Sequence, residues 1–149
     1  MTAQEFINYK AEVEESFGNC SVISSNMAGT MTNADKTGDR EAYKSWDWID
    51  YYRAMTGNHN ETFFCSSCGK EITNNPSLVQ CLRFSNGDDK PQKHKALGGH
   101  IWITAQEGDS FTGGRYITPL CPECNAKRGK QIPMRKGITL CKELGAKKV

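Results

Sequence analysis

Apolar residues recur with a helical period at the start of this 149-residue chain. Four of them lie three or four positions apart and share one face of a helix: Phe6, Tyr9, Val13 and Phe17. The residues Thr2-Ala3-Gln4-Glu5 have the form of a capping box, and Gly18 is suited to the end of a helix. The pattern predicts a helix over residues 2–17 whose apolar face packs in the core.

A second helix is predicted from Asp39 to about Met55. Aromatic residues lie around more than one of its faces, namely Tyr43, Trp46, Trp48, Tyr51 and Tyr52. We expect this aromatic helix to be packed on two sides, because small domains need large side chains to fill a core. In the alternative, part of it forms a surface for a protein partner. Residues 18–38, rich in Ser, Asn, Thr and Gly, are predicted to form a loop.

Beyond Phe63 the apolar residues come in short runs that are typical of strands. Three strands are predicted, at residues 78–84, 101–104 and 115–118. A short helix from Pro122 to Gly129 and a final strand or hairpin within residues 132–140 are predicted to follow. The chain is therefore expected to be an α+β protein, with a helical N-terminal region at residues 1–60 and a second domain at residues 61–149.

Charge is distributed unevenly, although the net charge is only +2. Residues 1–60 carry nine acidic and five basic residues, whereas residues 126–149 carry eight basic residues and one acidic residue. This basic C-terminal tail could contact the phosphates of DNA or RNA, or could simply be solvated. No apolar run is long enough to span a membrane and no secretory signal is visible, so no membrane partner and a cytoplasmic location are expected.

Four of the seven cysteines form two pairs with C-x2-C spacing, Cys65 with Cys68 and Cys121 with Cys124. Two such pairs can surround one Zn²⁺ with four thiolates in a tetrahedron, which is a structural site without an open coordination position. The odd number of cysteines fits a reducing compartment better than a disulfide framework. The other three, Cys20, Cys81 and Cys141, are expected to be small buried residues. Of these, only Cys81 is a candidate substitute ligand.

The region from about Phe64 to Gly129 resembles the zinc-stapled HNH (His-Me finger) endonucleases, a treble-clef family. The resemblance rests on the four paired cysteines, on Gly99-His100-Ile101, and on Tyr116-Ile117-Thr118-Pro119-Leu120 before the second pair. It implies a ββα zinc domain in which a strand carries a histidine and a helix follows the second cysteine pair.

In that family a second divalent cation, Mg²⁺ or a transition metal, binds the scissile phosphate while a histidine activates water. By this resemblance, His100 would be the general base and Asn125 the helical ligand of the cation. Gly99 stands where an acidic ligand is expected, and the usual mid-motif asparagine is absent near Tyr116. A carboxylate from Glu107 or Asp109 could take the place of the missing ligand.

Three functions remain open on these features. An HNH-like zinc module without a complete catalytic site would bind nucleic acid without cutting it. With a complete site it would be a metal-dependent nuclease that uses His100. A protein-interaction factor would instead act through the aromatic helix around Trp46 and Trp48.

Overall fold

The computed structural model describes residues 3–17, 22–25, 29–33, 47–86, 91–102 and 115–143. Its helices are α1 (Ala3–Phe17), α2 (Trp48–Thr56), α3 (Pro76–Asn86), the 3-10 helix η1 (Pro91–His94) and α4 (Pro122–Asn125). Its strands are β1 (Val22–Ser25), β2 (Gly29–Asn33), β3 (Thr62–Phe64), β4 (Glu71–Thr73), β5 (Leu97–Trp102), β6 (Arg115–Leu120), β7 (Gln131–Met134) and β8 (Ile138–Lys142). The predicted α+β class is confirmed.

Six strands form one antiparallel sheet in the order β1-β8-β6-β5-β2-β7. Its centre is the β5–β6 pair, which runs in register from Leu97 opposite Leu120 to Trp102 opposite Arg115. The predicted C-terminal strands are present as β7 and β8, but they do not form a hairpin. β7 pairs with β2, and β8 pairs with β1 and β6. The two strands therefore lie in separate parts of the sheet.

The predicted loop at residues 18–38 is wrong where the structure describes it, because β1 and β2 both lie there. Thr30, Thr32 and their neighbours in β2 pair with β7 on one side and β5 on the other. Backbone hydrogen bonds to strands far along the chain stabilise these polar segments, and a local hydrophobic pattern does not reveal such partners. Because β1 and β2 belong to the same sheet as β5–β8, the sheet crosses the expected domain boundary near residue 60.

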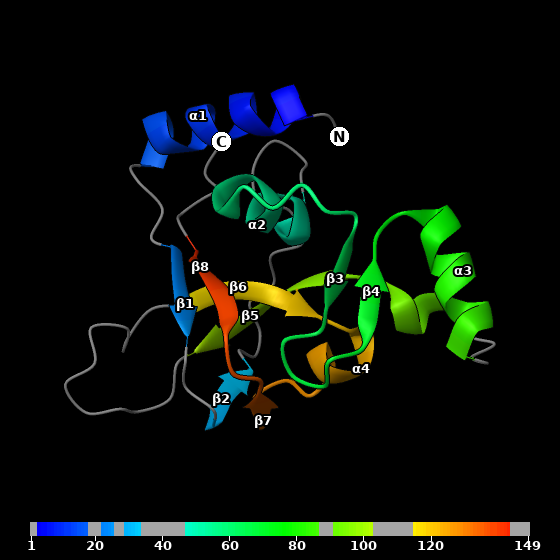
Figure 1. Cartoon of the computed structure of the whole chain (residues 1–149). Coiled ribbons are helices and arrows are strands. Elements are labelled where there is room, and N and C mark those ends of the chain that lie inside the picture. The colour runs from blue at the N-terminus through cyan, green and yellow to red at the C-terminus, as the bar shows by residue number, and fades with distance from the viewer. Residues whose placement is uncertain are drawn as a thin grey trace.

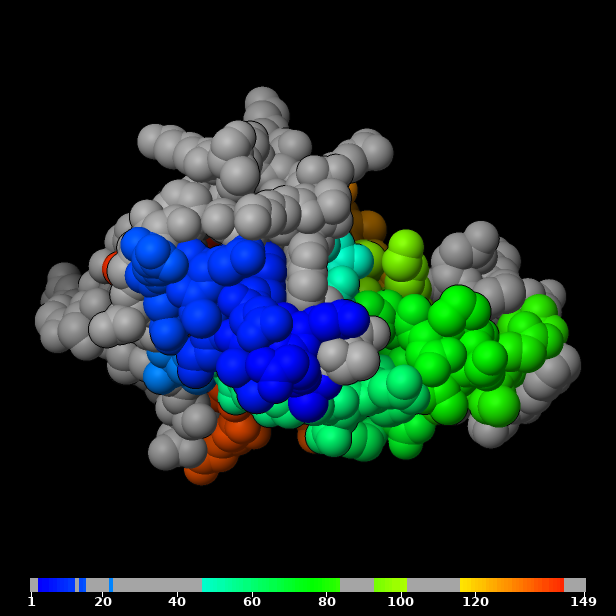
Figure 2. Space-filling view, turned by 90° about the horizontal axis from the view of Figure 1, so that it is seen from above, coloured from blue at the N-terminus to red at the C-terminus, as the bar shows by residue number. Residues whose placement is uncertain are grey.

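The aromatic helix α2 lies between α1 and the sheet (Figure 1). Trp48, Tyr51 and Tyr52 are buried, and the tyrosine hydroxyls donate to main-chain oxygens of β8. The space-filling view from above shows α1 lying over α2, while α3 projects to one side (Figure 2). The described part of α2 is thus packed on two sides, as predicted, and its buried aromatic residues are not available to a partner. The prediction of one continuous helix from Asp39 is wrong, because the backbone at Asp47 is extended and α2 begins at Trp48. Residues 39–46, including Trp46, lie outside the described residues.

The predicted strand at residues 78–84 is wrong, since this segment belongs to α3. Asn75 accepts a hydrogen bond from the Ser77 amide at 3.0 Å, and Pro76 is the first helical residue. This Asn-Pro start is a helix signal. The first turn of a helix tolerates proline, and the asparagine side chain accepts a hydrogen bond from a backbone amide of that turn. Three apolar residues of α3 are half-buried at helical spacing: Leu78, Val79 and Leu82. A short apolar run fits either a strand or a buried helix, and periodicity alone does not distinguish the two.

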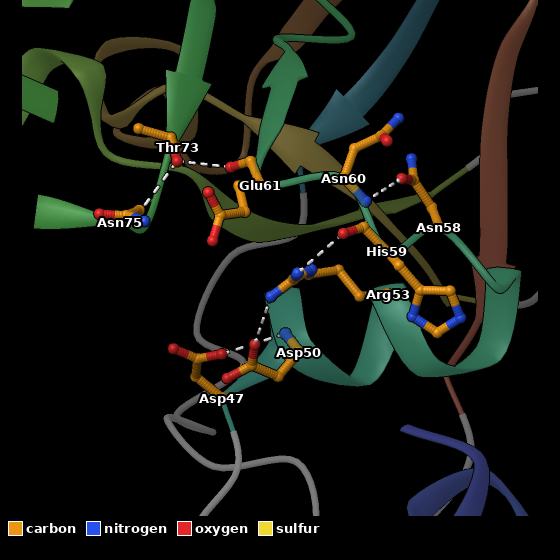
Figure 3. A network of polar contacts seen from close by, with 9 residues as sticks. All are labelled: Asp47, Asp50, Arg53, Asn58, His59, Asn60, Glu61, Thr73 and Asn75. Carbon is orange, nitrogen blue, oxygen red and sulfur yellow. Dashed lines mark hydrogen bonds and ion pairs between the residues drawn. The ribbon is translucent and has the colours of Figure 1, made fainter. Parts of the chain in front are cut away.

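A polar network at the start of α2 connects this helix to the segment that follows it (Figure 3). Asp47 caps the helix by accepting a hydrogen bond from the Asp50 amide at 3.1 Å. Arg53 lies 3.5 Å from the Asp50 carboxylate and donates to the His59 carbonyl at 3.3 Å. The Arg53 guanidinium also lies over the Phe6 ring of α1, 4.6 Å from its centroid. The Arg53 side chain therefore contacts α1, α2 and the loop that follows α2.

Protein stability is expected to decrease as the pH rises from about 4 to about 6, through the carboxyl group of Asp50. Burial, together with a hydrogen bond and repulsion from Asp47, raises the pKa of Asp50 from 3.8 to about 6 against the opposing effect of Arg53. In this interval the unfolded chain has released the proton that the folded protein still holds, so ionisation favours unfolding. The pKa can be measured by following the Asp50 carboxyl carbon by NMR. In Asp50→Asn the slope of stability against pH should flatten between these values, and a carboxyl that titrates near 4 would contradict the prediction.

Candidate metal centre

The first cysteine pair lies in the turn of the β3–β4 hairpin. The Cys65 amide donates to the Lys70 carbonyl at 2.8 Å, and the Gly69 amide donates to the Cys65 carbonyl at 2.9 Å. Gly69 has φ 81°, in the left-handed region that L side chains rarely adopt. This tight turn directs the Cys65 and Cys68 thiols toward one point, which explains why glycine follows the pair.

The second pair lies where β6 ends and α4 begins. Cys121 is the N-cap of α4, and its sulfur accepts a hydrogen bond from the Cys124 amide at 3.4 Å. Pro122 occupies the first helical position, where a missing amide is tolerated. The short helical turn brings Cys124 back beside Cys121, and the extended backbone at Cys121 connects both to the central sheet.

The structure brings the four thiols together within 4.8 Å of one another, and this group could hold a metal ion. Cys65, Cys121 and Cys124 are buried, while Cys68 is exposed. The Cys68 and Cys121 sulfurs are 3.7 Å apart. A tetrahedron with metal–sulfur distances of about 2.3 Å has edges of about 3.8 Å, so this separation fits a zinc-sized ion.

Hydrogen bonds and burial shift the pKa values of three of the four thiols, those of Cys65, Cys121 and Cys124. A hydrogen bond from the Cys121 thiol lowers the pKa of Cys65 from 9.0 to about 4, against the opposing effect of burial. The same hydrogen bond raises the pKa of Cys121, and burial raises the pKa of Cys124. Among these three thiols, ionisation is therefore favoured at Cys65 and disfavoured at Cys121 and Cys124. A divalent cation would reverse this preference and stabilise the deprotonated form of every ligand.

Buried hydrogen bonds hold the first knuckle, Cys65–Cys68, against the sheet. The Ser66 hydroxyl lies 2.6 Å from the hydroxyl of Thr118 in β6, which donates to the Thr139 carbonyl of β8 at 3.0 Å. The Ser66 amide donates to Pro119, and the Ser66 carbonyl accepts from the Arg135 amide at 2.8 Å. The residues between the two cysteines thus have a structural role, because they position the knuckle against the sheet.

The candidate general base His100 lies in the middle of β5, opposite Ile117, and is buried. Its ring packs edge-on against Trp48 of α2, with the centroids 4.8 Å apart and the planes at 79°. Its Nε2 lies 3.8 Å from Oε2 of Glu143, whose side chain is only 8% exposed. His100 is therefore enclosed between α2 and the end of β8.

The candidate cation ligand Asn125 lies on the opposite face of β5. A Cβ atom added to Gly99 would meet Leu120 at 2.3 Å and the Asn125 side-chain oxygen at 3.2 Å, so this face of β5 looks toward α4. A Cβ atom added to Gly98 would meet the backbone of Trp48, on the same side as His100. Neighbouring residues of a strand point to opposite faces. The structure consequently does not bring His100 and Asn125 together at one site.

Sequence reasoning did not single out Glu143, the residue beside His100. It is the sole acidic residue of the tail, and 43 positions separate it from the histidine. No local spacing links the two, because the contact arises from the pairing of β8 with β6 in the sheet. The proposed substitute carboxylates Glu107 and Asp109 lie outside the described residues.

Among the described residues, Cys81 and Cys141 are not part of the four-thiol group. Cys141 is buried in β8, as expected. Cys81 is exposed on α3, so the expectation that it is buried is wrong. Its position on α3 turns the side chain toward solvent. Cys20 lies outside the described residues.

Fold and site together define an α+β protein with a four-cysteine cluster that can hold a metal ion. Comparisons of the chain with protein-family models, with curated proteins and with solved structures find no match. Within the described ranges, no helix combines the length and apolar character needed to cross a membrane.

Proposed function

We propose that this protein is a nucleic-acid-binding module stabilised by one structural zinc ion. The convergence of four thiols within 4.8 Å, from two knuckles far apart in the chain, is the observation that supports this proposal. Four cysteine thiolates are a preferred ligand set of Zn²⁺, and they occupy all four positions of its tetrahedron. Such an ion has no site for water or substrate, so its role is structural.

Exposed basic residues surround the proposed zinc site and support a nucleic acid as the partner. Five of them lie in the segments that flank β7: Lys127, Arg128, Lys130, Arg135 and Lys136. Lys127, Arg128 and Lys130 follow the second knuckle, Cys121–Cys124. The main-chain amide of Arg135 donates a hydrogen bond to Ser66 of the first knuckle, Cys65–Cys68. The Arg135 guanidinium lies against Gly69. Cations held on a rigid frame suit the phosphates of a nucleic acid.

The geometry favours binding over cleavage. An HNH nuclease requires its histidine and its metal ligands to face one phosphate. Here His100 faces Trp48 and Glu143, while Asn125 faces Gly99 and Leu120 across the strand. The resemblance to HNH endonucleases supports the class of partner, and the divided site supports a member that binds without cutting.

The full zinc-loaded chain is expected to bind labelled DNA or RNA with an affinity that decreases steeply with salt. With roughly four phosphate contacts, the affinity should decrease about 100-fold between about 50 and about 200 mM salt. Fluorescence anisotropy measures this decrease. Replacing Lys127 and Arg128 together by glutamine should reduce the salt dependence by about two contacts, whereas Lys10→Gln on α1 should not change it.

The same mixtures test cleavage, with Mg²⁺, Mn²⁺ or Ni²⁺ added and zinc kept in place. The nucleic acid is expected to remain intact. Cutting that needs the added cation and disappears in His100→Ala would show that the protein is a nuclease. A failure to bind any nucleic acid at low salt would contradict the proposed partner but leave the zinc site unaffected.

A further inference from the structure

A cavity of about 270 Å³ lies beside the first knuckle. One wall comes from the loop after α2, with Asn58 and Asn60. The floor includes Phe64 of β3 and Ser66, and the other wall is the β7–β8 turn with Arg135 and Lys136. Tyr52 of α2 and Pro119 of β6 complete the lining, so residues far apart in the chain meet here and the cavity is a product of the tertiary fold.

The lining has an unusual chemical composition for a small polar hollow. It contains two cations and no carboxylate, and all of its lining residues are among those the structure describes. Phe64 is 56% exposed, because β3 turns Phe63 into the core and Phe64 outward. An exposed aromatic ring next to two cations and two carboxamides matches a ligand that is aromatic and anionic.

The walls of the cavity are positioned before any ligand arrives. The Asn58 side-chain oxygen accepts from the Asn60 amide at 3.0 Å (Figure 3). The Asn58 amide donates to the Thr56 hydroxyl at 3.4 Å. On the opposite wall, the Arg135 amide is bonded to the Ser66 carbonyl. Phe64 directly precedes the metal-site residue Cys65. Binding would thus require little ordering of the main chain, which favours affinity.

We propose that this cavity binds one nucleotide of a single-stranded nucleic acid, an inference that rests on the proposed nucleic-acid partner. The base stacks on Phe64, within reach of the carboxamides of Asn58 and Asn60. The phosphate contacts Arg135 and Lys136. A base in a duplex is already stacked and paired, so only an unpaired base can reach the ring. The volume is below the usual range of about 300–1,000 Å³ for whole small-molecule ligands, which suits one unit of a longer chain.

The experiment compares a labelled oligothymidylate of about 12 nucleotides with a hairpin duplex of the same length, bound to the full zinc-loaded chain. Phe64→Ala is expected to weaken single-strand binding about tenfold or more and to leave duplex binding unchanged. Phe64→Tyr should retain the wild-type affinity, because it keeps an aromatic ring. Lys136→Gln should reduce the salt dependence of single-strand binding by about one phosphate contact.

The double variant Lys127→Gln, Arg128→Gln is the matched control, because both residues are exposed but do not line the cavity. This variant should lower the affinity for the single strand and for the duplex by the same factor. Equal single-strand affinity for Phe64→Ala and wild type would overturn the cavity assignment, as would a wild-type protein that binds only duplex, and either result would leave nucleic-acid binding in place. No binding to either molecule would overturn both proposals. Circular dichroism and zinc content establish that each variant is folded.

Discussion

Removal of zinc is expected to unfold the region of the two knuckles and to lower the melting temperature of the whole chain. Binding of Zn²⁺ to four thiolates contributes about 10–16 kcal/mol in small zinc modules, which is comparable to the total stability of a domain. In this protein the ion would join the β3–β4 turn to the start of α4, which are linked otherwise by a few hydrogen bonds. Circular dichroism during heating, with and without a strong chelator, measures the loss.

Substitution of single ligands gives the same test without a chelator. Cys68→Ser and Cys121→Ser should each lose stoichiometric zinc, unfold the region of the two knuckles and lower the melting temperature of the whole chain. Cys81→Ser is the matched control, since its thiol is exposed on α3 outside the four-thiol group, and it should keep both zinc and stability. An unchanged melting curve in the chelator would contradict the proposed zinc site.

Gly98→Ala is expected to destabilise the fold by about 3 kcal/mol or more. The added methyl group would lie 2.5 Å from the Trp48 carbonyl carbon and 2.6 Å from the Ile49 amide nitrogen. These are backbone atoms of α2, so the contact can be relieved only by moving the helix away from β5. That movement would also disturb the packing of Trp48 on His100 and the tyrosine hydrogen bonds to β8. Urea unfolding gives the difference in free energy.

Two further glycine variants show whether the close approach of α2 causes this effect. In Gly99→Ala the new methyl group meets mainly the end of the Leu120 side chain, which can change rotamer, so a smaller loss is expected. In Gly57→Ala no atom lies within 4 Å, and only the backbone strain at φ 71° remains, which costs about 1 kcal/mol. If the three variants were equally stable, direct packing of α2 on β5 would not be the reason for glycine at position 98.

The elements that the sequence predicted well are those with signals inside one segment. The apolar period of α1, the burial of Phe6 and Tyr9 and the short strands β5 and β6 all agree with local patterns. The elements that it missed depend on distant partners. β1 and β2 are short and half or more of their residues are polar, and they are strands because they pair with strands far along the chain. In α3, Asn75-Pro76 is a local helix signal, but the apolar run after it is equally compatible with a strand.

The cysteine spacing by itself determined which residues form the candidate metal centre, because two C-x2-C pairs carry their geometry in the local turn. Only the tertiary structure decided what surrounds that centre. It placed His100 against Trp48 and Glu143, and it turned Gly99 toward Asn125 on the other face of the same strand. It also assembled the cavity of Phe64, Arg135 and Lys136 from separate segments. Ligand spacing is a property of a few adjacent residues, whereas the face of a strand and the walls of a cavity depend on which distant segments pack together.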